Sequence, residues 1–203
     1  MATPIVDFIF DFGSPNAYLA HRVIPSIEAR TGVKFRYVPA LLGGIFKATG
    51  NRSPMEAFGG VKGKLAYEAL ETRRFVARHG VTKYRPNPHF PVNTLMIMRG
   101  AVAAQDLGVF EPYVEACFVA MWEDGRKMDD PAVVAESLAA AALPAERLLE
   151  LTQDPSVKDR LIAFTNAAVD RGVFGIPTFF VGEEMFFGKD RLQDVEEEIA
   201  RAV

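Results

Sequence analysis

The sequence predicts an α/β protein in which a sheet domain is interrupted by an all-helical insertion. Strand patterns occur only near the two ends of the chain, helical patterns fill the region between them, and the chain opens as a β-α-β unit. The 203 residues, 49% hydrophobic and 24% charged, suit one folded domain that carries a large insertion. We expect residues 1–39 and 154–203 to form the sheet domain and residues 40–153 the insertion.

The first β-α-β unit is read from three short stretches. "IVDFIFDF" (5–12) is β-branched, aromatic and mostly apolar, which is typical of a buried strand. A helix should follow, with Ser14 as its N-cap, Pro15 in its first turn and Gly32 at its end, and Pro25 predicts a kink or break within it. "VKFRYVP" (33–39) alternates with period 2, so we expect a second strand, parallel to the first.

The insertion shows no strand pattern. The glycine-rich stretch 41–54 predicts a loop, residues 61–80 predict a helix that ends at Gly80, and residues 83–93, with three prolines, predict an extended loop. Four more helices are expected, at residues 94–108, 113–125, 131–143 and 144–153.

Sequence patterns typical of strands occur again near the end of the chain. Residues 154–172 predict a long helix that begins at the N-cap Asp154. Residues 175–188 contain two β-rich runs around Gly182, which indicates a hairpin. Residues 191–203 predict a final amphipathic helix.

Charge and cysteine content limit the function. The net charge of −3 argues against bulk nucleic-acid binding, and no apolar stretch of about 18 residues predicts a membrane span. The N-terminus does not resemble a signal peptide, so we expect a cytoplasmic protein. We also expect no metal site. The single cysteine, Cys117, excludes an intrachain disulfide. Residues 34–85 hold eleven Lys/Arg against three acids, which indicates either a small anionic ligand or a solvated helix face.

Four motifs occur in a fixed order: "FDFGSPNAYLA", "LLGGIFKATGN", "FGIPTFFV" and "MFFGKDRL". Together they resemble the 2-hydroxychromene-2-carboxylate isomerases of the DsbA-like group, which are similar to kappa-class glutathione transferases. The resemblance spans nearly the whole chain and implies a thioredoxin-like fold with a helical insertion. It also implies a homodimer in aromatic catabolism, with glutathione as cofactor and a small aromatic carboxylic acid as substrate.

Ser14 is the catalytic candidate. Dithiol relatives carry Cys-x-x-Cys where this chain has Ser14-Pro15-Asn16-Ala17, and dithiol exchange needs two thiols. The resemblance implies that the Ser14 hydroxyl donates a hydrogen bond to the glutathione thiolate, with Pro15 and Asn16 at the helix N-terminus. The alternative is an N-cap only. A nucleophilic serine would need a base, but His21 lies two turns further along the helix and no G-x-S-x-G motif is present.

The resemblance implies that further residues also contact glutathione. It implies a cis Ile176–Pro177 bond that directs the Ile176 backbone toward the glutathione peptide; the residues alone favour a trans bond at a strand start. Lys189 and Asp190 would bind the γ-glutamyl end, although Asp190 also suits an N-cap. Asn51 matches a glutathione contact of the kappa class, although "TGN" is also an ordinary turn.

The second substrate is assigned to Lys47, His89 and Trp122. The resemblance implies that Lys47 pairs with the substrate carboxylate and that His89 stands near the place of a substrate-contacting tyrosine in the isomerases. Trp122 either walls an aromatic pocket or belongs to the core. The predicted activity is a glutathione-dependent isomerisation by reversible thiolate addition. The alternatives are conjugation of an electrophile, as in a kappa-like transferase, and binding of glutathione or an acid without turnover.

Overall fold

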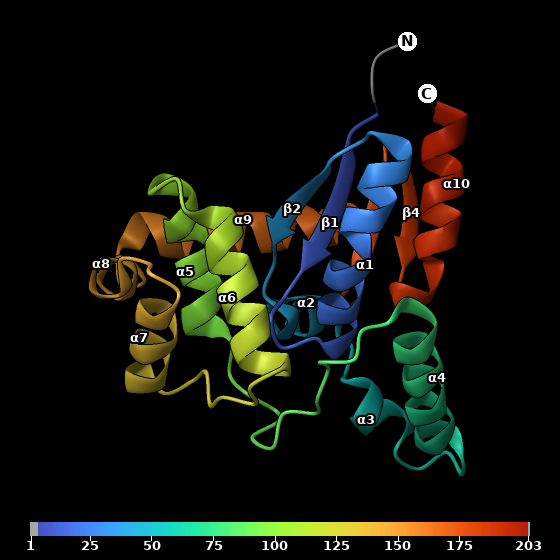
Figure 1. The fold of residues 1–203 in the computed structure, drawn as a ribbon, viewed down its shortest axis with the longest axis horizontal. Coiled ribbons are helices and arrows are strands. Elements are labelled where there is room, and N and C mark those ends of the chain that lie inside the picture. The colour runs from blue at the N-terminus through green and yellow to red at the C-terminus, as the bar shows by residue number, and fades with distance from the viewer. Residues whose placement is uncertain (1–3, 203) are drawn as a thin grey trace.

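A four-stranded mixed sheet forms the centre of the molecule in the computed structural model, which describes residues 4–202 (Figure 1). The strand order is β2-β1-β3-β4, with β1 parallel to β2 and antiparallel to β3, and with β3 and β4 joined as a hairpin. The predicted parallel pair and hairpin are therefore confirmed. The strands are β1 (Val6–Phe10), β2 (Phe35–Pro39), β3 (Thr178–Val181) and β4 (Glu184–Phe187).

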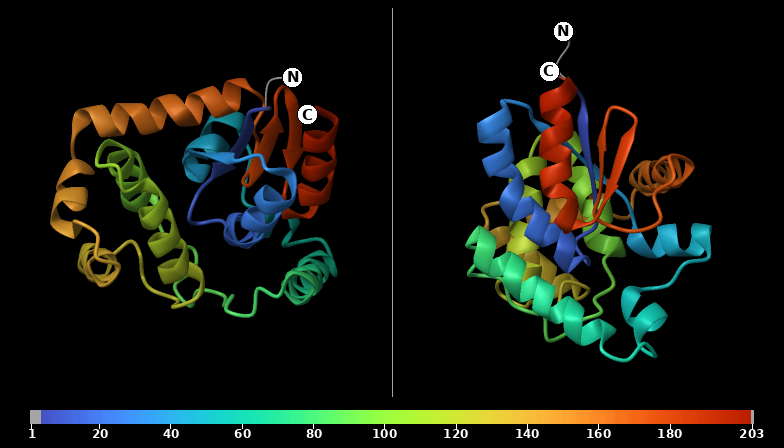
Figure 2. Two further views of the ribbon diagram at one scale, coloured as in Figure 1. Left: turned by 45° about the horizontal axis from the view of Figure 1, so that its top comes forward. Right: turned by 90° about the vertical axis from the view of Figure 1, so that its right-hand side faces the viewer.

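Helices cover both faces of this sheet. Helices α1 and α10 pack against each other, and α9 lies against β2 on the opposite face. Figure 2 shows α9 running from the sheet to the group of helices at the far side of the molecule. These elements are α1 (Pro15–Thr31), α9 (Pro155–Asp170), α10 (Leu192–Ala202) and a short 3₁₀ turn, η1 (Lys189–Arg191), that precedes α10.

The insertion consists of helices joined by loops, and none of its residues lies in a strand. Helix α5 packs against α6, α8 and α9, and α6 reaches α1, so the helices share one aromatic core with the sheet. Phe118 of α6 lies 5.0 Å from Phe12 and 5.8 Å from Phe10, measured between ring centroids. The helices are α2 (Leu42–Thr49), α3 (Pro54–Phe58), α4 (Lys64–His79), α5 (Leu95–Asp106), α6 (Phe110–Trp122), α7 (Pro131–Ala140) and α8 (Ala145–Leu151).

The structure differs from the sequence-based expectation in two places. The stretch 41–54, expected to be a loop, forms α2 and the start of α3, because the Leu42 N–H is bound by the Asp11 carboxylate and Ile45 is buried. Of the kink or break predicted at Pro25, the break is absent, because α1 continues past this residue. Pro25 is on the exposed side of α1 while Ile24 and Ile27 are buried, and this packing offsets the lost backbone hydrogen bond.

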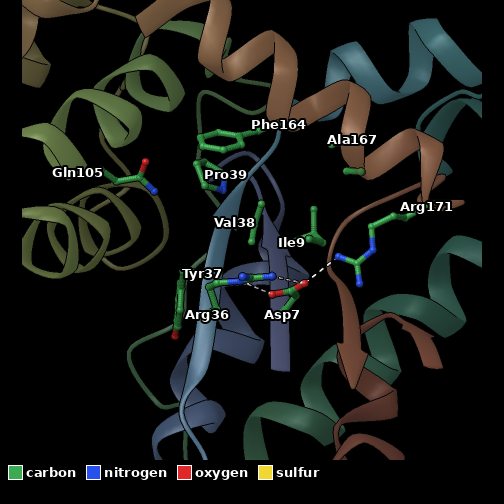
Figure 3. A pocket seen from close by; sticks show the side chains of 11 residues that line it. Asp7, Ile9, Arg36, Tyr37, Val38, Pro39, Gln105, Phe164, Ala167 and Arg171 are labelled. Atoms are coloured by element: carbon green, nitrogen blue, oxygen red, sulfur yellow. Dashed lines mark hydrogen bonds and ion pairs between the residues drawn. The ribbon is translucent and has the colours of Figure 1, made fainter. Parts of the chain in front are cut away.

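The sheet face beneath α9 holds an ion cluster around the buried carboxylate of Asp7 (Figure 3). Asp7 of β1 is only 2% exposed and accepts hydrogen bonds from Arg36 of β2 at 2.6 and 3.0 Å. Arg171, just after α9, donates to the same carboxylate at 2.7 Å. Burial alone would raise the pKa of Asp7, but the two guanidinium groups outweigh it and hold that pKa below its usual range.

Candidate active site

Ser14 joins the start of α1 to the loop before β3. Its hydroxyl donates to the carbonyl oxygen of Ile176 at 3.0 Å and accepts from the Ala17 N–H at 3.2 Å. The side chain is 4% exposed and also acts as the N-cap of α1. The two motifs that the sequence separates by more than 160 residues therefore meet at one hydroxyl.

Two backbone donors beside Ser14 are free. Within the described part of the chain, neither the Asn16 N–H nor the Ile176 N–H has a hydrogen-bond acceptor. The Asn16 N–H belongs to the first turn of a 17-residue helix, where the helix dipole favours an anion. The site can therefore offer two N–H groups, one hydroxyl and one carbonyl to a ligand that carries a negative atom next to a peptide.

The Ile176–Pro177 bond is cis, as the resemblance implied. The Pro177 carbonyl accepts from the Gly188 N–H at 2.9 Å, which places the start of η1 beside this loop. In η1 the Lys189 ammonium donates to both carboxylate oxygens of Asp190 at 2.8 and 2.9 Å. Lys189 is 5% exposed whereas the Asp190 side chain is 62% exposed, so the Asp190 carboxylate remains open to an ammonium group.

Asn51 reaches the same loop from the other side. Its amide nitrogen lies 3.5 Å from the carbonyl oxygen of Phe174, two residues before Ile176. The Phe174 and Phe187 rings lie 4.5 Å apart by centroid and are both partly exposed. The end of α2 is thereby attached to the loop that carries the cis peptide.

Trp122 supports the Ser14 loop from within the insertion. Its indole N–H donates to the Phe12 carbonyl at 2.7 Å, and the side chain is 2% exposed. Its ring lies 6.0 Å from that of Phe90 by centroid. His89 is exposed on the same proline-rich loop, which remains without helix or strand as predicted, and its N–H donates to the side chain of Asn87 at 2.8 Å.

Lys47 lies near the end of α2. It lines a hollow between α2, α5 and α9, and neither Ser14 nor any other predicted site residue lines that hollow. The direction of Lys47 follows from the face of α2 on which it lies, and α2 is a helix that the sequence did not predict.

Asp11 is a site residue that the sequence reasoning missed. Its carboxylate is fully buried and accepts from the N–H groups of Gly13 at 2.8 Å and Leu42 at 2.7 Å. Burial raises its pKa, although these backbone donors and the Thr94 hydroxyl oppose the shift. Asp11 thereby holds the Ser14 loop against α2 and the start of α5. The available signal was a carboxylate directly after a buried strand and before "GSP".

The thiol of the chain takes no part in this site. Cys117 lies in α6, is fully buried, and burial raises the pKa of its thiol to about 12. Among residues 4–202, no helix is long and apolar enough to cross a membrane.

Comparison with known proteins gives consistent results. The family model of the DSBA-like thioredoxin domain matches residues 5–200. The 2-hydroxychromene-2-carboxylate isomerase of Pseudomonas putida is 32% identical over 200 residues, which cover 97% of this chain and 95% of that protein. Glutathione S-transferase kappa 1 of Caenorhabditis elegans is 28% identical over 93% of this chain and 87% of its own length.

A solved structure of 2-hydroxychromene-2-carboxylate isomerase has the same fold, with a TM-score of 0.84 and 28% identity over 98% of this chain and 95% of that chain. The full-length match, the sheet order and the helical insertion agree with one another. The chain belongs to the DsbA-like thioredoxin-domain family and, within it, to the 2-hydroxychromene-2-carboxylate isomerase family.

Proposed function

We propose that this protein is a glutathione-dependent isomerase of a 2-hydroxychromene-2-carboxylate-like aromatic acid. Relatives named 2-hydroxychromene-2-carboxylate isomerase are 30–32% identical over nearly the whole chain, and they support an isomerase. The kappa-class relatives support glutathione as the cofactor. The observation that carries the proposal is the Ser14 hydroxyl, 3.0 Å from the Ile176 carbonyl and beside two unpaired N–H groups.

The residues present fit glutathione. A thiolate needs hydrogen-bond donors and a favourable dipole, and the Ser14 hydroxyl and the Asn16 N–H at the start of α1 supply them. The adjacent peptide needs one donor and one acceptor, and the Ile176 backbone has both. The exposed carboxylate of Asp190 suits the ammonium of the γ-glutamyl end. When bound, glutathione would supply the thiolate that adds to the substrate and leaves again unchanged.

Ser14 can exchange hydrogen-bond partners without leaving a polar group unpaired. Its hydrogen now points to the Ile176 carbonyl. A peptide N–H bound at that carbonyl would replace the Ser14 donor, and the hydroxyl hydrogen would then turn to the sulfur. The Ala17 N–H keeps the oxygen in place throughout. Ser14 therefore stabilises the anion and needs no general base.

The proline-rich loop and α6 would form the substrate side. Trp122 fixes this region to the carbonyl of Phe12, two residues before Ser14. His89 is exposed on the loop and can donate to a substrate carboxylate or hydroxyl, whereas Trp122 supports the wall from the core because it is 2% exposed.

The test is isomerisation of 2-hydroxychromene-2-carboxylate followed by absorbance, with glutathione, with S-methylglutathione and with neither. We expect turnover with glutathione alone, and mass spectrometry should recover all of the glutathione after many turnovers. S-methylglutathione is the matched control because it can bind but has no thiol. Turnover without glutathione would refute the cofactor assignment. Loss of one glutathione for each product would instead identify a kappa-like transferase, which the 27–28% identity to kappa enzymes keeps as the second candidate. Glutathione binding without any turnover would identify a binding protein.

A further inference from the structure

The hollow between α2, α5 and α9 has an unusual charge distribution. Its volume is about 430 Å³, and it is lined by Lys47 of α2, Arg99 of α5 and Lys158 of α9. None of the described residues that line it is acidic. Three helices thus bring one cation each to a single concave surface.

These three cations lack counterions. Among residues 4–202, none of them lies within 4.0 Å of a carboxylate oxygen. Arg160, two residues after Lys158 on the same helix, is paired with Asp106 at 2.6 Å. Arg99 and Lys158 are both partly buried, where like charges repel more strongly than in water. Unpaired cations around one hollow favour the binding of an anion with more than one negative charge.

The floor of the hollow is apolar. Leu41, Leu95, Leu161 and Ile162 contribute to it, and Ile162 is 57% exposed although it is a large hydrophobic residue. The Thr165 hydroxyl is already satisfied, since it donates to the Leu161 carbonyl at 2.8 Å and accepts from the Leu41 N–H at 3.0 Å. The floor therefore favours a hydrocarbon surface over a small hydrated ion.

We propose that this hollow is a second ligand site, separate from the Ser14 site, that binds a small organic anion with at least two negative charges on a compact apolar body. The negative groups would lie against Lys47, Arg99 and Lys158, and the apolar body against Ile162 and its neighbours. The volume suits a small organic molecule of this kind.

The first experiment uses phthalate as the probe, added to the full-length protein saturated with glutathione. Calorimetry should show binding, and amide NMR shifts should map to α2, α5 and α9. Arg99→Gln and Lys158→Gln should each weaken binding by about tenfold or more, because each removes one charged contact. Arg73→Gln is the matched control, since Arg73 is exposed on α4 and has no acidic partner among the described residues. Ser14→Ala should leave phthalate binding unchanged.

The second experiment separates charge from apolar contact. Ile162→Ser should weaken phthalate binding several-fold and leave sulfate binding unchanged, because sulfate has no apolar body. Three results would overturn the proposal: no phthalate binding at millimolar concentration, shifts confined to residues around Ser14 and Ile176, or equal affinity for sulfate and phthalate. None of these results bears on whether turnover of the isomerase substrate requires glutathione. The proposal of a second site can therefore fail while the proposed isomerase function stands, and the reverse also holds.

Discussion

The Ser14 hydroxyl makes two hydrogen bonds, one that caps a helix and one at the proposed glutathione site. As the N-cap of α1 it accepts from the Ala17 N–H, which fixes the first turn of the helix. As a donor it reaches the Ile176 carbonyl, where the proposed glutathione peptide would bind. Under this proposal a substitution at Ser14 would change both helix stability and catalysis, and an experiment has to measure the two separately.

Ser14→Ala should lower the turnover number by about tenfold or more and raise the pKa of the bound thiol, because the thiolate loses one hydrogen-bond donor. Removal of the cap should also cost about 1 kcal/mol of unfolding free energy. Thiol pKa is read from thiolate absorbance against pH, and stability from urea unfolding.

Asp130→Ala is the matched stability control, because Asp130 caps α7 far along the chain by accepting from the Ala132 N–H at 2.9 Å. It should cost a similar unfolding free energy and leave turnover intact. If Asp130→Ala lowers turnover as much as Ser14→Ala does, Ser14 is an N-cap only.

Asp7 gives a prediction for the dependence of stability on pH. Its pKa is lowered in the folded protein, so its stabilising effect is complete above the unfolded value near 3.9 and is lost as pH falls through the folded value. The double variant Arg36→Met/Arg171→Met leaves the buried carboxylate unpaired. We expect it to lose about 3 kcal/mol of unfolding free energy at pH 7 and less at pH 3, because the unpaired carboxyl of the variant is neutral at the lower pH while the wild-type protein is losing the stabilising effect of the ionised pair.

Addition of Asp7→Leu to that double variant should restore stability at pH 7 and remove the difference between the two pH values, because no buried charge remains. Equal stability losses of the double variant at pH 3 and pH 7 would show that the ion cluster is not the cause. Urea unfolding at both pH values measures these quantities.

The elements of the insertion pack closely enough for single methyl groups to matter. At Gly100 of α5, an added Cβ would lie 2.0 Å from the Tyr113 hydroxyl of α6, and that hydroxyl is buried and donates to the Ile97 carbonyl at 2.8 Å. Gly100→Ala should therefore cost about 3 kcal/mol of unfolding free energy, since neither helix can move aside without losing contacts.

The matched control is Gly43→Ala in α2, where an added Cβ meets no atom within 4 Å. It should be neutral or stabilise the protein by up to about 1 kcal/mol. Tyr113→Phe removes the nearest atom and should recover part of the loss in Gly100→Ala. Failure of Gly100→Ala to destabilise the protein in thermal or urea unfolding would show that α5 and α6 adjust freely.

Elements that carry strong local signals were predictable from the sequence. The β-branched and aromatic runs gave the three confirmed strand regions, and Ser14, Asp154 and Gly80 marked helix ends correctly. Helix α2 was not predictable, because two glycines in its first turn resemble a loop. Its stability comes from a partner distant in sequence, the Asp11 carboxylate that binds the Leu42 N–H.

At the scale of the whole molecule, the sheet domain and the insertion share contacts that should make them unfold together. The Trp122 indole of α6 donates to the Phe12 carbonyl, and the Tyr18 hydroxyl of α1 donates to Glu123 at 3.1 Å. His21 of α1 contacts Glu115 of α6 at 2.9 Å. We propose that residues 1–39 with 154–203, and residues 40–153, are two structural regions of one cooperative unit.

Trp122 is the single tryptophan of the chain, so its fluorescence reports the contact between these regions. Urea unfolding followed by this fluorescence and by far-ultraviolet circular dichroism should give one coincident transition. Two separate midpoints would mean that the insertion unfolds independently.

The residues of the candidate site could be placed together only because the family resemblance implied the fold. Proximity of Ser14 and Ile176 depends on β1 and β3 being neighbours, which no local pattern reveals. For Lys47 the direction of the side chain could not be predicted from the sequence, because it depends on α2 and its packing against α9. The role of Asp11 was not predicted, because its carboxylate binds the backbone N–H groups of Gly13 and Leu42, and Leu42 belongs to another element.

The burial of Cys117 has a consequence for the covalent integrity of the protein. A protein that works with a thiol cofactor is surrounded by disulfides and peroxides, which attack accessible thiolates. Because the pKa of this thiol is about 12 and its side chain has no exposed surface, the chain offers no thiolate at neutral pH. Glutathionylation and sulfenic acid formation therefore have no target in the native state. The cysteine of this chain is thereby protected from thiol–disulfide exchange as long as the protein stays folded.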